Sequence, residues 1–85
     1  MSNKYNEEIL VVDKTTGRNL YGMRVQMNCT QAEFGKKVGI DQSSMSAYER
    51  GERLPSKRTV RKVAAYFGLD PLQITGQRPM VWSAL

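Results

Sequence analysis

The sequence contains no histidine and one cysteine, Cys29. Without a second cysteine the chain cannot form an internal disulfide, and without histidine a zinc site lacks its commonest ligand. The same absence excludes the Ser–His and Cys–His pairs that activate many protein nucleophiles. The sequence also lacks a phosphate-binding loop and a pair of carboxylates placed for acid–base chemistry. We therefore expect no enzymatic activity, no metal and no cofactor.

Long apolar runs are missing as well. No stretch approaches the roughly 20 apolar residues that cross a bilayer, and the polar start is unlike a signal peptide. These features predict a protein of the reducing cytoplasm with no membrane partner. The 85 residues suffice for one small domain. A core of this size is marginal, which favours stabilisation by oligomerisation.

The charge that is present is mostly positive. Thirteen lysines and arginines stand against eight acidic residues, giving a net charge of +5. Many small domains are mildly basic, so the distribution of the charge is more informative than its total. Six basic residues and one acid, Glu52, lie between positions 50 and 62. The six are Arg50, Arg53, Lys57, Arg58, Arg61 and Lys62.

Apolar periodicity and capping residues predict five short helices and an all-α fold. The expected ranges are 17–27, 31–38, 42–50, 57–67 and 71–75. The clearest amphipathic pattern is in the fourth range, where Val60, Val63, Ala64 and Phe67 recur at helical spacing. We expect Thr16 to cap the first helix.

Residues 30–47 predict two helices joined by a tight turn. Thr30 and Glu33 have the spacing of a capping box, Gly39 can take the left-handed conformation that ends a helix, and Asp41 can cap the next helix. The following turn carries small polar side chains, which can hydrogen-bond to base edges when a helix enters the major groove. This pattern indicates a helix-turn-helix whose base-reading residues lie within 42–47.

Two apolar segments lie outside these helices. Ile9–Val12 is short and β-branched and predicts a strand, and Met80–Leu85 is an apolar tail. The strand could dock on its own domain or pair with the tail as a small sheet, and a disordered tail is the other alternative. Either segment could support a dimer or bind a protein partner. The chain thus divides into an arm (1–16), a helix-turn-helix domain (17–75) and a tail (76–85).

Several of these motifs together resemble the Cro/lambda-repressor helix-turn-helix family, also called the xenobiotic-response-element regulators. The resemblance covers about residues 17–75. It implies a five-helix lambda-repressor-like domain, the third helix in the major groove, and dimers on pseudo-palindromic sites. Cys29 and Gly35 replace the leucine and alanine usual in the family, and neither change threatens the fold. The matching positions are Thr30-Gln31, Gly39, Gln42-Ser43, Glu49-Arg50-Gly51 and Leu54-Pro55.

The resemblance also implies roles for individual residues. Gln42 would read a base, and its amide suits the N6/N7 edge of adenine. Gln31 would touch a phosphate and brace Gln42, and Glu49 is expected to pair with a nearby arginine. We expect Met45 and Tyr48 to face inward. The base-reading candidates are Gln42, Ser43, Ser44, Ser46 and Ala47, all but Ser44 expected outward, and the phosphate-binding candidates are Gln31, Arg50, Arg53 and Lys57.

The sequence therefore predicts a DNA-binding transcriptional regulator. Its expected partner is double-stranded DNA, which it would bind as a homodimeric repressor on a pseudo-palindromic operator. The alternative is a protein-interaction module on the same scaffold, such as an antitoxin or a bridging coactivator. Its binding arm would be Ile9–Val12 or Met80–Leu85.

Overall fold

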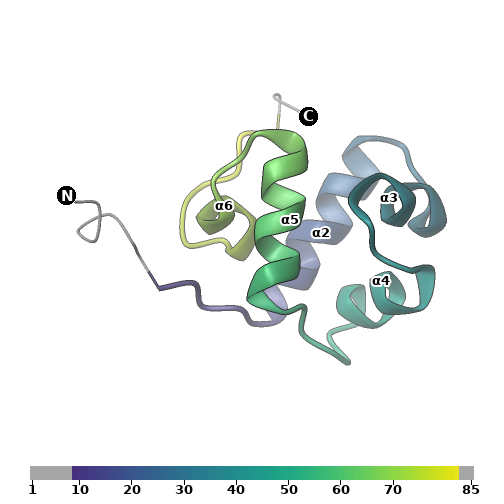
Figure 1. The fold of residues 1–85 in the computed structure, drawn as a ribbon, viewed down its shortest axis with the longest axis horizontal. Helices are drawn as coiled ribbons and strands as arrows, with labels where there is room; N and C mark the ends of the chain where they lie inside the picture. Colours follow the sequence, from purple (N-terminus) through teal and green to yellow (C-terminus); the bar gives the residue numbers. More distant parts are fainter. Residues whose placement is uncertain (1–8, 83–85) are drawn as a thin grey trace.

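Each helix in the described part of the chain begins at a side chain that caps its first turn. The computed structural model describes residues 9–82, and within them the chain forms five helices (Figure 1). The expected all-α fold is confirmed, and three of the predicted ranges match to the residue. The helices are α2 (Lys14–Gln26), α3 (Gln31–Val38), α4 (Gln42–Glu49), α5 (Lys57–Phe67) and α6 (Pro71–Thr75), with N-caps Asp13, Thr30, Asp41, Ser56 and Asp70.

Helix α2 begins three residues earlier than expected. Asp13, not Thr16, is its N-cap, since the Asp13 carboxylate accepts a hydrogen bond from the Thr15 amide at 2.9 Å. Thr16 is the reciprocal partner in this capping box, because its hydroxyl accepts from the Asp13 amide at 3.4 Å. The prediction that Thr16 caps the helix is therefore wrong.

The core lies where the five helices meet. Phe34 of α3 is fully buried and stacks on Phe67 of α5 with ring centroids 5.8 Å apart. Helix α5 packs against α3 and α6, while α2 packs against α4 and α6 (Figure 1). The largest fully buried side chains are Phe34, Leu20, Met23, Met45, Ile74, Val60, Val63 and Thr16.

The arm over Ile9–Val12 is extended but forms no strand, so the strand prediction is wrong. Its backbone is held by a side chain instead. The Gln77 carboxamide accepts from the Val11 amide at 2.9 Å and donates to the Ile9 carbonyl at 2.8 Å. Leu10 is buried in the core. Of the two arrangements considered, docking on the same domain is observed, and no sheet with residues 80–82 forms.

The tail packs on α2 and accounts for a glycine in the middle of that helix. A Cβ at Gly22 would lie 2.7 Å from the Trp82 ring, so the absent side chain makes room for the indole. Trp82 remains 38% exposed. Residues 83–85 of the predicted tail and 1–8 of the predicted arm lie outside the described residues. None of the helices within 9–82 has the length and apolar character needed to cross a membrane.

Candidate nucleic-acid interface

Helix α4 is seated against a glycine at each end. A Cβ at Gly35 of α3 would lie 2.1 Å from the Ile40 carbonyl oxygen, in the turn that leads into α4. A Cβ at Gly17 of α2 would lie 2.0 Å from the Tyr48 carbonyl oxygen, near the end of α4. Both distances are far below van der Waals contact, so the present packing requires glycine at these two positions.

A mostly buried ion pair also fixes the end of α4 to α2. The Arg24 guanidinium donates two hydrogen bonds to the Glu49 carboxylate, at 2.7 and 2.9 Å, and a third to the Cys29 carbonyl. The two side chains are 16% and 6% exposed. The hydrogen bond that Arg24 donates to Glu49 raises the pKa of Arg24, and burial opposes this effect. The expectation that Glu49 pairs with an arginine is confirmed.

Gln31, the first residue of α3, belongs to this network. Its amide nitrogen donates to the Glu49 carboxylate at 3.0 Å. The resemblance implied that Gln31 braces Gln42, but here its amide is bound to Glu49 instead. One carboxylate therefore joins α2, the start of α3 and the end of α4. Such a buried, hydrogen-bonded pair holds three elements in one geometry.

The first turn of α4 divides into an exposed and a buried side. Gln42 and Ser43 are exposed, and Met45 and Tyr48 are buried as expected. Ser44 is buried, because its hydroxyl and amide both donate to the Asp41 carboxylate, at 2.7 and 2.9 Å. These two hydrogen bonds, with a smaller contribution from the nearby Arg53 charge, lower the pKa of Asp41.

Ala47 was expected to face outward, and this expectation is wrong. It is 7% exposed. The chain that follows α4 folds back on this position, since the amides of Glu52 and Arg53 both donate to the Ala47 carbonyl, at 2.9 and 3.4 Å. Ala47 also lies one turn after the buried Ser44 on the same side of the helix. The exposed polar surface of α4 is therefore made by Gln42 and Ser43, with Ser46 half-buried.

Two arginines flank this surface, each already bound to a serine of α4. Arg50 donates to the Ser46 hydroxyl and to the Glu52 carboxylate, the latter at 2.8 Å. The Glu52 hydrogen bond raises the pKa of Arg50. Arg53 donates to the Ser44 hydroxyl at 3.3 Å, and its guanidinium lies 5.4 Å from the Tyr48 ring centroid. Both cations are thereby placed beside the exposed polar surface of α4.

Sequence reasoning missed the contacts between Arg53 and α4. The only local signal is the spacing of Asp41 and Ser44, which suits an N-cap that also binds a hydroxyl. The stacking of Arg53 on Tyr48 has no signature in the sequence, because it depends on how the loop folds back. Lys57, the first residue of α5, is exposed near the same loop.

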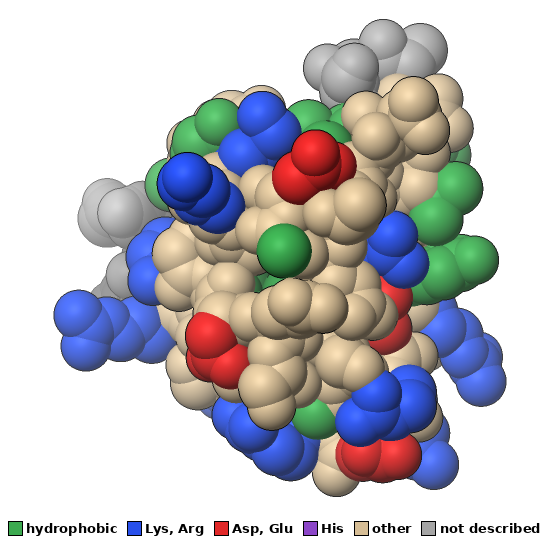
Figure 2. Space-filling view, turned by 90° about the vertical axis from the view of Figure 1, so that its right-hand side faces the viewer, with side chains coloured by type: hydrophobic (Ala, Val, Ile, Leu, Met, Phe, Trp, Pro, Cys, Tyr) green, Lys and Arg blue, Asp and Glu red, His purple; other side chains and the backbone are tan. Residues whose placement is uncertain are grey.

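The charge distribution on this side of the molecule is uneven. Figure 2 views the side that carries α3 and α4, where uncharged polar side chains and backbone occupy the middle and most Lys and Arg side chains lie toward the edges. Backbone phosphates are met by cations and base edges by uncharged hydrogen-bonding groups. The arrangement fits a nucleic-acid surface. No cluster of three or more potential metal ligands occurs in the described part of the chain.

Comparison with known proteins identifies the family. A family model described as helix-turn-helix matches residues 20–74, which is more than half of the chain. This match covers α3, α4 and α5 completely. It leaves out only the first turns of α2 and the last residue of α6. No solved structure matches the chain significantly. The chain belongs to the Cro/C1-type helix-turn-helix family.

Three curated relatives illustrate the range of this similarity. Antitoxin PezA of Streptococcus pneumoniae is 31% identical over 76% of this chain and 41% of its own length. The cryptic phage CTXphi transcriptional repressor RstR of Vibrio cholerae is 32% identical over 55% of this chain and 42% of its own length. An uncharacterised HTH-type transcriptional regulator of Methanocaldococcus jannaschii is 35% identical over 54% of this chain and 70% of its own length. The chain thus spans less than half the length of the first two relatives.

Proposed function

We propose that this helix-turn-helix protein is a sequence-specific DNA-binding transcriptional regulator, acting as a homodimeric repressor. The observation that carries the proposal is the exposed polar first turn of α4, presented on a helix whose position is fixed by Gly17, Gly35 and the Arg24–Glu49 pair. A reading element must be rigid to discriminate between bases, because a small displacement breaks paired hydrogen bonds. The repressor among the relatives supports the sign of regulation.

In this proposal the side chains of α4 divide the work. Gln42 reads an adenine with its amide, Ser43 contacts the adjacent base, and Ser46 joins once Arg50 turns from its hydroxyl to a phosphate. Arg53, Lys57 and the start of α3 at Gln31 contact the backbone. Phosphate contacts set the register of the protein and base contacts set its sequence preference.

The dimer is proposed to form through α6 and the two chain ends. Two-fold symmetry of the protein would then match a pseudo-palindromic site, with half-sites about 34 Å apart. Exposed apolar side chains at both ends support this assignment. They are Ile9, Val11, Val81 and Trp82.

Selection of bound sites from random DNA, followed by titration of variants, tests the proposal. Gln42→Ala should lose about 1–3 kcal/mol on the selected site and almost nothing on random DNA, because it removes a contact to one base. Arg53→Ala should weaken binding to all sequences and make the salt slope shallower by about 0.9 for each protomer bound. Arg61→Ala, an exposed cation of α5, is the matched control. Equal loss from Gln42→Ala on both DNAs would refute the reading assignment.

A second candidate function is supported by the antitoxin among the relatives. In this case the scaffold would bind a protein partner through the exposed apolar groups at Ile9–Val12 or Val81–Trp82. A stable second protein that co-purifies with the chain in a fixed ratio would favour this function. Sedimentation of the purified chain as a dimer that occupies a selected DNA site would favour the repressor.

A further inference from the structure

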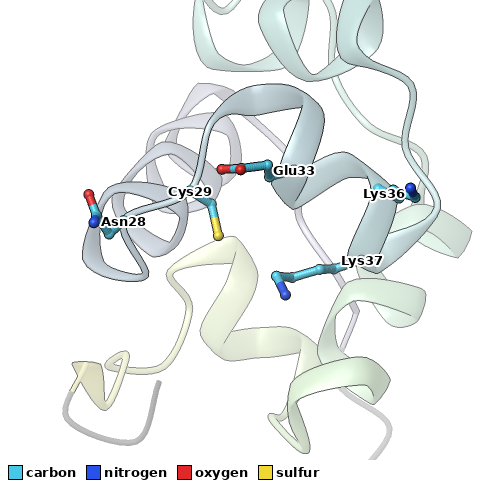
Figure 3. A pocket seen from close by; sticks show the side chains of 5 residues that line it. All are labelled: Asn28, Cys29, Glu33, Lys36 and Lys37. Carbon is cyan, nitrogen blue, oxygen red and sulfur yellow. The ribbon is translucent and has the colours of Figure 1, made fainter.

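Two adjoining hollows lie along α3, one running from the residues before its start to its last turn and the other at its end. The first has a volume of about 460 Å³ and is lined by Asn28, Cys29, Glu33, Lys36 and Lys37 (Figure 3). The second has a volume of about 510 Å³ and lies between α3 and α5. Because Lys36 and Lys37 line both, we treat them as one open groove and call it the lysine groove. The second hollow is lined by Lys36, Lys37, Val38, Gly39, Lys62, Ala65 and Tyr66.

The groove is strongly positive. Lys36, Lys37 and Lys62 line it, against one carboxylate, Glu33. Among residues 9–82 these three ammonium groups make no ion pair. Lys62 donates to the Gly39 carbonyl at 3.3 Å, which holds its charge at the end of α3. Figure 3 shows Lys37 reaching into the space in front of Cys29 while Lys36 leaves the helix in the other direction.

An aromatic side chain lines the same groove. Tyr66 of α5 is 54% exposed, and its ring meets the edge of Phe67 with centroids 4.9 Å apart. Its exposed neighbour Ala65 lines the hollow beside it. Cations in the last turn of α3 are ordinary partners of the helix dipole. That explanation covers Lys36 and Lys37, and the Gly39 carbonyl gives Lys62 a partner at the same helix end. It does not account for the exposed tyrosine that these cations surround.

We propose that the lysine groove binds an acidic segment of another protein. Carboxylates of the partner would pair with Lys36, Lys37 and Lys62, and an apolar side chain between them would pack on Tyr66 and Ala65. This binding goes beyond DNA recognition. Lys37 lies about 9 Å along α3 from Gln31, and the residues that line the groove come from α3, α5 and the chain beside α3, with none from α4. Complementary charge would bring the partner to this face and an apolar contact would fix its position.

A peptide titration tests the inference. The probe is a synthetic peptide of sequence EEFEELEE, titrated into the ¹⁵N-labelled protein, with KKFKKLKK as the charge-reversed control. We expect saturable one-to-one binding of the acidic peptide only, with amide shifts confined to residues 36–39 and 62–66. The double variant Lys36→Glu/Lys62→Glu should lower the affinity about tenfold, because it replaces exposed attractions by repulsions.

Two further variants separate the groove from general charge attraction. Arg61→Glu changes an exposed cation one residue from Lys62, on a different side of α5, and should lower the affinity much less. Tyr66→Ser keeps every charge and should still weaken binding severalfold. The proposal is overturned if Arg61→Glu matches a charge reversal in the groove, if the shifts fall on α4, or if a DNA duplex bound by the protein displaces the peptide.

Discussion

Three glycines within helices allow another part of the chain to pack closely against the helix backbone. The atoms that these glycines face differ in kind. Gly17 and Gly35 face backbone carbonyls at the two ends of α4, whereas Gly22 faces the outer atoms of the Trp82 ring. A backbone carbonyl inside a packed bundle cannot move without its helix. A ring at the edge of a tail can turn aside. Helix α4 is thus fixed by its surroundings, and the tail is held by a contact that can adapt.

The polar contacts of the two regions differ in the same way. The pair that holds α4, Arg24 with Glu49, is mostly buried and carries three hydrogen bonds from one guanidinium. The arm is held by the carboxamide of a single exposed residue, Gln77. Water can replace the second contact at low cost but not the first. We therefore expect loss of the contacts around α4 to lower the free energy of unfolding of the domain, and loss of the exposed contacts at the chain ends to act locally.

Gly17→Ala should have the largest effect. The added methyl would meet the Tyr48 carbonyl at 2.0 Å, so α2 and α4 must separate. Overpacking usually costs about 1–3 kcal/mol and occasionally more. Because backbone must move here, we expect about 4 kcal/mol, of which the higher helix propensity of alanine recovers only about 1 kcal/mol. Urea denaturation at unchanged slope measures the loss. A loss below about 1 kcal/mol would show that α4 can shift and would remove the contrast with the tail.

Glu49→Ala should cost about 2 kcal/mol. It leaves the Arg24 charge without its carboxylate, a change that costs more when both groups are fully buried. Arg24 keeps its bond to the Cys29 carbonyl and some contact with water, which reduces the loss. Glu52→Ala is the matched control, because it breaks an ion pair whose side chains are 54% and 58% exposed. Equal effects of the two variants on the free energy of unfolding would contradict this view of α4.

Gly22→Ala should change stability by less than about 1 kcal/mol in either direction. The gain in helix propensity opposes the displacement of the Trp82 ring, whose outer atom would lie 2.7 Å from the new methyl. Trp82 is the only tryptophan, so a red shift of its fluorescence reports the displacement directly. A loss as large as that of Gly17→Ala would mean that the tail is as rigidly seated as α4.

Whether a feature could be predicted from the sequence depends on how far apart along the chain its contacting residues lie. The bounds of α3, α5 and α6 could be predicted because their signals are local. Thr30, Ser56 and Asp70 cap the starts, and Gly39 and Gly68 take the left-handed conformation at two of the ends. The start of α2 was misplaced because Asp13 and Thr16 both suit a cap, and the sequence does not show which one accepts the other's amide.

The failed strand prediction has a different cause. Ile9–Val12 has the composition of a strand, but strand formation needs a backbone partner, and the partner that it finds is the side chain of Gln77, 66 residues along from Val11. Local composition cannot reveal such a contact. The buried Ala47 is a similar case, since the loop that folds back on its carbonyl is placed by tertiary packing.

The exposure of Gln42 and Ser43 in the first turn of α4 could be predicted. The pH dependence of the N-cap of this helix provides the smallest test. Bonds from Ser44 and the charge of Arg53 lower the pKa of Asp41 in the folded protein. The contribution of Asp41 to stability is therefore complete above about pH 4 and lost as the pH falls through its folded-state pKa. Because Asp41 is exposed, the effect is small.

Ser44→Ala removes the largest cause and should flatten the acid limb of the unfolding free energy below about pH 4. Ser43→Ala, on the exposed side of the same turn, should leave that limb unchanged, and NMR titration of the Asp41 carboxyl should show the matching rise in pKa only in Ser44→Ala. Identical titration curves in the two variants would mean that Ser44 does not hold the Asp41 cap. The first turn of α4 would then be less rigid than the close packing at Gly35 requires.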